Sequence, residues 1–375
     1  MTQPTNNGRF NPKNALPTRF GRLQEIRNIV EQKKLRRLVR KAGFKKRSGY
    51  KLDELIKAGV LAKCTGAKAV LEVSHTIKDP AICCSASNST MSRVYEYGEE
   101  CKVKKLWWGI TRGFRLGRGK VWLIDGTFIR VYGDKFEFVA EGWDSSEGKI
   151  SLGYLLINVY DLVNNQPIFQ VLLPGNASEK VQFTKVLSEA MGVCDRKPQV
   201  LVFDRGFLSK DNLKWLDERG ILWVSVALQN MNISRRSKAR KPKTWFDHYE
   251  MSNLVKGYWR KYGSLNLVKD ETIEDGKLVE VRYLVGSPVL SAEDIIRFYE
   301  RRWMIEEYHK QIRELGLNVL PTGKFDGLRL HVVLVALVFI ILHSFASGAG
   351  IIRKSVKTII RCISVAALVF VEGVS

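Results

Sequence analysis

Short apolar runs of strand length begin near residue 120 and set the middle of the chain apart from what precedes it. Five of them are strand candidates: 121–124, 154–160, 168–173, 200–203 and 222–227. Turn-forming residues at 164–167 separate the second run from the third. Helical spacing of apolar residues predicts helices over about 178–191 and 210–219. Three strands in succession, followed by strands that alternate with helices, predict a mixed α/β sheet.

The alternation of predicted strands and helices stops between residues 230 and 290. A cationic cluster there includes Arg235, Arg236 and Lys238, and short alternating stretches follow at 265–268 and 279–285. We therefore predict a β-rich insertion in the sheet domain. A long helix is expected to start at Ser291, which can cap it and is followed by acids in the first turn, and to end near Gly316.

The segment 330–352 contains no Lys, Arg, Asp or Glu and is long enough to cross a bilayer. Only 332–342 is almost solidly apolar, however, and His331 and His343 flank it together with serines and glycines. A fully buried helix in a globular domain explains this pattern better than a membrane span, so no membrane partner is expected.

The charge balance points to a polyanion. Lys and Arg total 61 against 38 Asp and Glu, a formal net charge of +23, which favours nucleic acid as the partner. Residues 33–47 carry nine cations and no acid, with helical apolar spacing, so a basic amphipathic helix is predicted; a solvated surface helix is the alternative. The expected DNA-binding residues are Lys33, Lys34, Arg36, Arg37 and Arg40, together with Arg235, Arg236 and Lys238 of the later cluster.

Two apolar runs end in an aspartate, Asp125 after residues 121–124 and Asp204 after 200–203. Burying a carboxylate beside a sheet costs free energy unless something pairs with it. Two such carboxylates on neighbouring strands would repel each other unless a divalent cation lay between them, and oxygen ligands alone suit Mg²⁺ or Mn²⁺. A turn cap is the alternative for either aspartate alone.

The predicted helix 291–316 supplies a third acid, Glu306. At about 100° per residue, one side of this helix within an arc of about 80° carries Tyr299, Arg302, Glu306, Lys310 and Arg313. The opposite side can dock on a core through Met304, Ile305, Tyr308, Ile312 and Leu315. A carboxylate among groups that grip phosphates would complete a metal site, whereas a solvated helix face is the alternative.

These residues resemble the DDE-class insertion-sequence transposases, in particular the insertion-sequence-four-like group. The resemblance covers about residues 120–345 and includes Asp125-Gly126-Thr127 and Asp204-Arg205-Gly206-Phe207. In that group the helix signature runs Tyr, Arg, Glu and Lys, at the spacing of Tyr299, Arg302, Glu306 and position 313 here. Arg313 replaces the lysine; it keeps the charge but differs in geometry.

The resemblance implies a ribonuclease-H-like mixed sheet with flanking helices, interrupted by a β-rich insertion, and a small helical N-terminal domain. The expected division is a basic DNA-binding domain over 1–115, a catalytic core over 116–229 and 291–350, the insertion over 230–290, and a helical C-terminal tail over 351–375.

The resemblance also implies DNA cleavage and strand transfer at terminal inverted repeats and into target DNA. Asp125, Asp204 and Glu306 would hold two Mg²⁺ ions, with Mn²⁺ as a substitute; one would activate water or a 3′-hydroxyl and the other would stabilise the leaving oxygen. Phosphates would be held by Tyr299, Arg302, Lys310 and Arg313.

The same resemblance implies an active homodimer in the cytoplasm of a prokaryote, at the nucleoid. Trp245 or Trp259 of the insertion could stack on a flipped base, although packing is the ordinary role of such residues.

Other functions remain open at this point. The chain could be a decayed or domesticated transposase that only binds DNA, or a generic ribonuclease-H-like nuclease. Residues 123–127 also resemble the nucleophile loop of haloacid-dehalogenase-type phosphatases, but Leu123 stands where that class needs its nucleophile.

Overall fold

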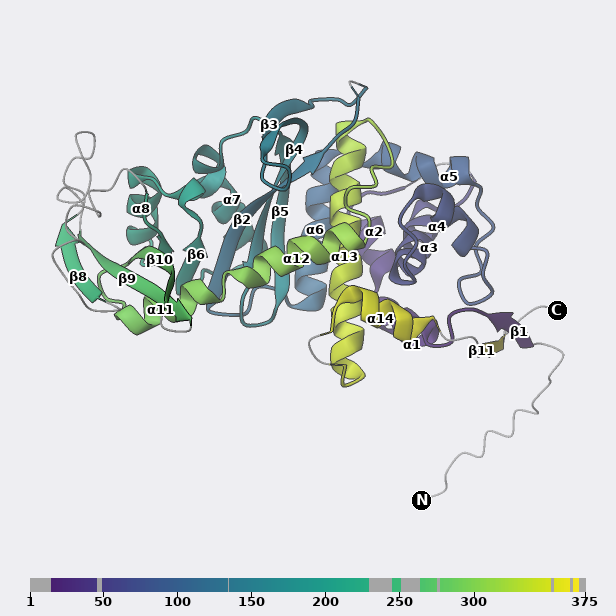
Figure 1. The fold of residues 1–375 in the computed structure, drawn as a ribbon. Helices are drawn as coiled ribbons and strands as arrows, with labels where there is room; N and C mark the ends of the chain where they lie inside the picture. Colours follow the sequence, from purple (N-terminus) through teal and green to yellow (C-terminus); the bar gives the residue numbers. More distant parts are fainter. Residues whose placement is uncertain are drawn as a thin grey trace, which may run out of the picture.

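The computed structural model describes residues 15–45, 49–133, 135–228, 245–250, 264–274, 277–351, 354–364 and 367–370. The described N-terminal part is mainly helical (Figure 1). Its elements are β1 (Ala15–Thr18), α1 (Leu23–Gln32), α2 (Leu35–Lys41), α3 (Leu52–Cys64), α4 (Val70–Thr76), α5 (Asn88–Ser92), η2 (Arg93–Tyr97) and α6 (Glu100–Phe114). Apolar side chains at helical spacing, such as Leu23, Ile26 and Val30 of α1, are buried in the core.

A mixed sheet fills the middle of the molecule (Figure 1). Its first strands are β2 (Val121–Arg130), β3 (Ala140–Asp144), β4 (Lys149–Asp161), β5 (Gln166–Pro174), β6 (Val200–Phe203) and β7 (Leu222–Val226). β4 is antiparallel to β2 and β5, whereas β6 is parallel to both β2 and β7. Helix α7 (Glu179–Cys194) packs on β4 and β5, and α8 (Lys210–Asp217) packs on β7. The predicted mixed α/β sheet with flanking helices is confirmed.

Strand β2 is longer than the sequence predicted. It continues through Asp125 and Gly126 to Arg130, because Thr127, Phe128 and Ile129 keep pairing with β4. The prediction that Asp125 ends its strand was therefore wrong. The neighbouring strand β6 does end at Phe203, which pairs with Ile124, so the sheet opens beside Asp125 on that side only.

Three strands occupy the region predicted to be a β-rich insertion: β8 (Trp245–Glu250), β9 (Ser264–Glu274) and β10 (Lys277–Gly286). They pair antiparallel, and β10 also pairs with β7, so they extend the main sheet. Trp245 is the first residue of β8. The candidates Arg235, Arg236, Lys238 and Trp259 lie outside the described residues.

The helix predicted from Ser291 to Gly316 is two helices, α11 (Ala292–Glu300) and α12 (Trp303–Glu314). Ser291 caps α11 as predicted, its Oγ accepting a hydrogen bond from the backbone N–H of Asp294 at 3.1 Å. At the link, the N–H of Arg302 donates to the carbonyl of Tyr299, three residues earlier. This is the hydrogen bond of a 3₁₀ turn, which is wound more tightly than an α-helix. The apolar spacing continues across this link, so the sequence pattern did not reveal it.

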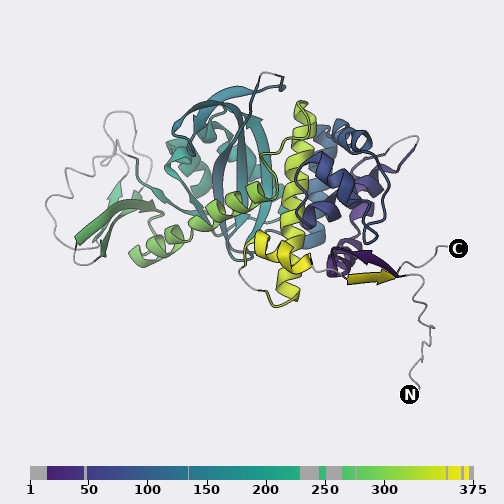
Figure 2. The same cartoon turned by 45° about the vertical axis from the view of Figure 1, so that its right-hand side comes forward.

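Helix α13 (Phe325–Gly348) runs between the N-terminal helices and the sheet (Figures 1 and 2). It contacts α1, α3 and α6 as well as β5 and α12. By length and composition it could cross a membrane, with mean hydropathy 2.3, but 83% of its most apolar window is buried in the protein. The prediction of a buried helix is confirmed, with its start at Phe325 rather than near residue 330.

The C-terminal part contains α14 (Val356–Ile363) and the strand β11 (Ala367–Phe370). β11 pairs antiparallel with β1 at the other end of the chain. The tail is thus only partly helical, unlike the prediction. Its β-branched and aromatic residues favour a strand once a partner strand is available.

Candidate active site

The two aspartates predicted to share a site lie side by side. Ile124 of β2 pairs with Phe203, the last residue of the parallel strand β6, so Asp125 on β2 lies next to Asp204, which directly follows β6. Asp204 caps the short helix η3 (Arg205–Phe207), its Oδ1 accepting a hydrogen bond from the backbone N–H of Arg205 at 2.7 Å. The sheet topology therefore brings together two carboxylates that are far apart in sequence.

A third carboxylate, Glu179, joins them, although the sequence alone did not point to it. Glu179 is the first residue of α7, and its side chain lies against Gly126 and Gly206: a Cβ atom on either glycine would overlap a Glu179 carboxylate oxygen. Burial, together with the smaller effect of the negative charge of Asp204, raises the pKa of Glu179 to about 7. An acid in the first turn of a helix is common, so the sequence carried no distinguishing signal.

Asp125 is the most perturbed carboxyl of the cluster. Burial is the main cause that raises its pKa to about 8; the positive charge of Arg302 opposes this shift, and the negative charges of Glu179 and Asp204 add to it. If all three carboxyl groups were ionised, they would repel one another. A bound cation would remove that repulsion and favour the ionised forms.

His309 of α12 was not predicted as a site residue either. It is buried, with Nδ1 3.8 Å from Oδ2 of Asp125 and Nε2 2.9 Å from the amide nitrogen of Asn158. Burial, helped by the charges of Arg313 and Arg302, lowers the pKa of His309 to about 3. Asn158 on β4 is the residue opposite Asp125 on β2. Asp125 therefore has two neutral polar neighbours, the imidazole of His309 and the amide residue Asn158.

Glu306 has a cation as its partner. It forms an ion pair with Arg302 at 2.6 Å, and its side chain is 52% exposed. Arg302 in turn acts electrostatically on Asp125, Asp204 and Glu306. In the described part of the chain, no three carboxylate, imidazole or thiol side chains are already arranged to hold a metal ion.

The other residues predicted on the Glu306 side differ in their surroundings. Tyr299 is buried, with Arg302 over its ring at 5.5 Å. Arg313 donates a hydrogen bond to the hydroxyl of Thr127 on β2 and is half-buried. Lys310 is exposed and lies 3.9 Å from Glu307. The predicted docking side is confirmed, because Ile305, Tyr308, Ile312 and Leu315 are buried and Met304 packs against the core.

The sequence predicted one basic helix over 33–47, but of the cations in the described residues only Arg36, Arg37, Arg40 and Lys41 lie on α2. α2 begins after Lys34, which has a left-handed backbone. Arg36 pairs with Asp53 at 3.0 Å and Glu54 at 2.7 Å, and Arg40 with Asp53 at 3.3 Å. The cluster thus has counter-charges, supplied by α3. Lys33 donates to the carbonyl of Gly113, whereas Lys34 and Arg37 are exposed.

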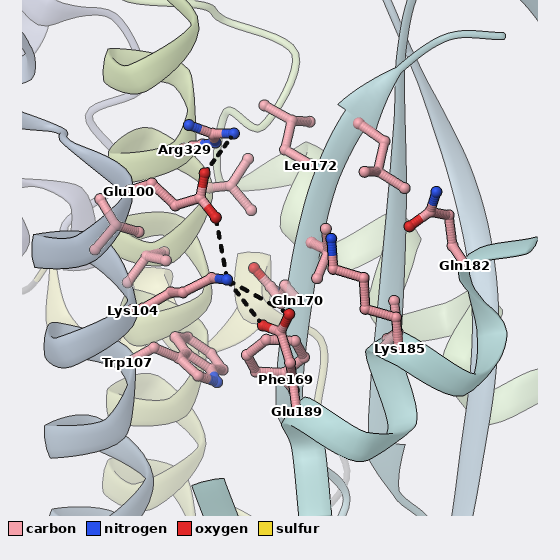
Figure 3. A pocket seen from close by; sticks show the side chains of 16 residues that line it. Glu100, Lys104, Trp107, Phe169, Gln170, Leu172, Gln182, Lys185, Glu189 and Arg329 are labelled. Atoms are coloured by element: carbon pink, nitrogen blue, oxygen red, sulfur yellow. Dashed lines mark hydrogen bonds and ion pairs between the residues drawn. The ribbon is translucent and has the colours of Figure 1, made fainter. Parts of the chain in front are cut away.

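A second group of charged residues borders a pocket between α6, α7, β5 and α13 (Figure 3). There Lys104 pairs with Glu100 at 3.0 Å and with Glu189 at 3.1 Å, and Glu100 also pairs with Arg329 at 3.0 Å. The apolar part of the lining includes Trp107 and Phe169. This network ties helix α6 of the N-terminal part to α7 and α13, and its charges are balanced.

Comparison with known proteins places the chain in a family. The family described as the transposase DDE domain matches residues 117–341, which include Asp125, Glu179, Asp204 and Glu306. The chain therefore belongs to this family and is a DDE transposase, a class of enzyme that cleaves and joins DNA with divalent metal ions.

Among solved structures, the chain is similar to a piggyBac transposase synaptic complex with hairpin DNA. The match has a TM-score of 0.48 and 14% identity, and covers 90% of this chain and 70% of that chain. No curated protein matches the sequence significantly.

Proposed function

We propose that this chain is an insertion-sequence-four-like transposase that cleaves DNA at the ends of its element and transfers the strands, using two Mg²⁺ ions. The observation that carries the proposal is the placement of Asp125 on β2 beside Asp204, which directly follows the parallel strand β6, within the family's domain. The position of Glu306 four residues after Arg302 and seven after Tyr299 supports the subgroup.

The donor set fits a hard divalent cation. The cluster offers carboxylate oxygens from Asp125, Asp204 and Glu179, with no thiol among them, and oxygen ligands are those that Mg²⁺ prefers. The raised pKa values of Asp125 and Glu179 follow from burial near other acids. When bound, the ions would activate the attacking oxygen and stabilise the leaving oxygen.

Glu306 must change partner to complete this site. In the structure Arg302 is held between Glu306 and the ring of Tyr299, and it is the cation that acts on both aspartates. Cations entering the site would replace that positive charge, so Glu306 could turn toward the aspartates. The freed Arg302 guanidinium, with its planar donors, is suited to a phosphate oxygen of the bound strand.

DNA binding would rest on the exposed cations Lys34 and Arg37 and on Lys310, four residues after Glu306 on α12. Arg313, which donates a hydrogen bond to Thr127 of β2, would contact a phosphate from that position. The piggyBac transposase structure is a complex with hairpin DNA; for this chain we propose the double-stranded terminal inverted repeats and target DNA as partners, and an active homodimer.

The test uses the full-length protein and a labelled duplex carrying the inverted repeat that flanks its coding region. Cleavage is expected with Mg²⁺ or Mn²⁺ and not with EDTA. Asp204→Asn and Glu306→Gln should abolish cleavage while leaving duplex binding within about twofold, since neither forms the predicted basic surface.

Glu307→Gln is the matched control, because Glu307 is the next residue on α12 and pairs with Lys310 instead. It should cleave like the wild type. Wild-type cleavage by Glu306→Gln would refute the role of Glu306, and binding without cleavage by the wild type would favour a protein that only binds DNA. Cleavage without preference for the repeat would favour a generic nuclease.

A further inference from the structure

Two positions at the acid cluster, 126 and 206, are glycine, and the same physical reason explains the absence of a side chain at both. Gly126 directly follows Asp125, and Gly206 lies two residues after Asp204. Neither has a positive φ, so backbone conformation does not require glycine at either position. What a Cβ atom would meet at both is the same group, the carboxylate of Glu179, one oxygen on each side.

The two glycines thus leave room for one side chain beside both aspartates. At Gly206 nothing other than Glu179 lies within 4 Å of the added Cβ, and at Gly126 the nearest atom after the Glu179 oxygen belongs to Leu155. Space next to a buried acid could have been filled by apolar atoms. Instead it holds a third carboxylate, which raises the electrostatic cost of the cluster.

Nothing within the described residues offsets that cost through a direct ion pair with Glu179. The contrast on the same helix is direct, because Glu189 pairs with Lys104 at 3.1 Å. A role as a helix cap also fails to explain Glu179, because its oxygens lie against Gly206 of η3 and Gly126 of β2. A carboxylate held among like charges is stabilised by a cation from outside.

We propose that Glu179 is a fourth carboxylate of the metal site, binding a divalent cation together with Asp125 and Asp204, and that Gly126 and Gly206 are needed to admit it. This inference rests on the proposed function, since it adds a ligand to the same site. Glu179 would hold its cation before Glu306 leaves Arg302, so a first ion could bind without DNA.

The first experiment measures Mn²⁺ binding to the metal-free, full-length protein without DNA, by the electron paramagnetic resonance signal of free Mn²⁺. Glu179→Gln should weaken the tightest site by about tenfold or more, since even groups that only support metal ligands change affinity by this much. Glu189→Gln, the same substitution on the same helix, should stay within about twofold. Unchanged affinity in Glu179→Gln would overturn the proposal.

The second experiment displaces Glu179 without removing an acid. Gly206→Ala should weaken Mn²⁺ binding because its Cβ would occupy the place of a Glu179 oxygen. In a Glu179→Ala background the added methyl group should have no further effect, which a double-mutant cycle detects as coupling. Equal losses from Gly206→Ala in both backgrounds would show that the glycine acts independently of Glu179 and would contradict the proposal.

Thermal unfolding of the metal-free variants separates binding from folding. Glu179→Gln should unfold at the wild-type temperature or above it, because it removes a like charge from the cluster. A lower temperature would indicate that Glu179 stabilises the fold and would count against a ligand role.

The outcomes of Mn²⁺ binding also distinguish the two proposals. If Asp204→Asn loses Mn²⁺ binding and Glu179→Gln retains it, only the role of Glu179 is contradicted. If both variants retain Mn²⁺ binding, the proposed metal site itself is contradicted.

Discussion

Helix α7 carries two glutamates in opposite electrostatic surroundings. At its N-terminus Glu179 lies beside Asp204 and near Asp125, and the pKa values of Glu179 and Asp125 are raised by burial and by these like charges. Further along, Glu189 belongs to the network at the pocket of Figure 3, where it pairs with Lys104. Hydrogen bonding to Lys104 lowers the pKa of Glu100 in the same network.

The two groups differ in whether their charges have partners within the described residues. Balanced pairs such as those of Lys104 join elements of the fold and need nothing further. The acid cluster has Arg302 as a nearby cation, but it keeps more negative charge than that one group can offset. Such an imbalance is maintained at a cost in stability, and it is typical of sites that bind an ion.

The largest expected effect comes from removing the charge of Asp125. Asp125→Asn should reduce strand cleavage by about a thousandfold or more, because metal ligation contributes several kcal/mol to phosphoryl transfer. The metal-free variant should be at least as stable as the wild type, since it loses an unfavourably buried charge. Cleavage assays and thermal unfolding check both halves; a strong loss of stability would mean that Asp125 is a structural residue like those of the network.

The next effect is a dependence of metal binding on pH. A carboxyl whose pKa is raised to about 8 or about 7 is largely protonated in the folded protein at pH 6. Mn²⁺ must displace these protons, so its affinity should rise from about pH 6 to about pH 8.5. In Asp125→Asn the rise should be smaller. An equal rise in both proteins would show that other groups cause it.

The same pKa shifts give the metal-free protein a pH-dependent stability. The folded state holds protons on Asp125 and Glu179 at pH values where the unfolded chain has released them. By linkage, the contribution of these groups falls as pH rises from about 4 through about 8. Thermal unfolding of the wild type and Asp125→Asn should therefore diverge with increasing pH, whereas Glu189→Gln should run parallel to the wild type.

The cations of the N-terminal helices can also be divided into exposed and paired groups, and we expect smaller effects from changing them. Lys34 and Arg37 are exposed, whereas Arg36 is paired with Asp53 and Glu54. Lys34→Ala with Arg37→Ala should weaken duplex binding and reduce its salt dependence by a slope of about 2, one for each phosphate that is no longer neutralised. Arg36→Ala should lower thermal stability more than it changes that slope. Binding measured across a range of salt concentrations decides between these outcomes.

The smallest effect is expected in the balanced network. Lys104→Met leaves Glu189 without its partner, but these side chains are partly exposed, so the loss should be about 0.5–1 kcal/mol of unfolding free energy. Mn²⁺ affinity should not change. A change in metal binding would show that the network and the acid cluster are coupled through α7.

The sequence was sufficient to predict the mixed sheet, because its strands are continuous apolar runs and the resemblance supplied their arrangement. It also pointed to Asp125 and Asp204 as a pair, since a carboxylate after such a run is unusual, and the pairing of β2 with β6 does bring the two together. It missed Glu179 and His309, because an acid in a first helical turn and a histidine on an apolar helix face both have ordinary explanations. Only the pairing of β2 with β6, and the space left by Gly126 and Gly206, place Glu179 beside the aspartates.

The break between α11 and α12 and the counter-charges of Arg36 escaped prediction for a related reason. The first depends on one hydrogen bond at Arg302, and the second on α3 folding against α2. The first is a local backbone conformation and the second is a contact between two segments, and the spacing of apolar residues predicts neither.

Helix α13 has a mechanical consequence for a protein that handles DNA. Most of its 24 residues are buried, and it contacts both the N-terminal helices and the sheet, so these two parts pack on the same helix. A duplex gripped by the first part would reach the acids at a fixed offset. The cleavage position would then lie a fixed number of base pairs from the bound segment. Inserting a few base pairs between that segment and the cleavage position would move the scissile bond away from the acids.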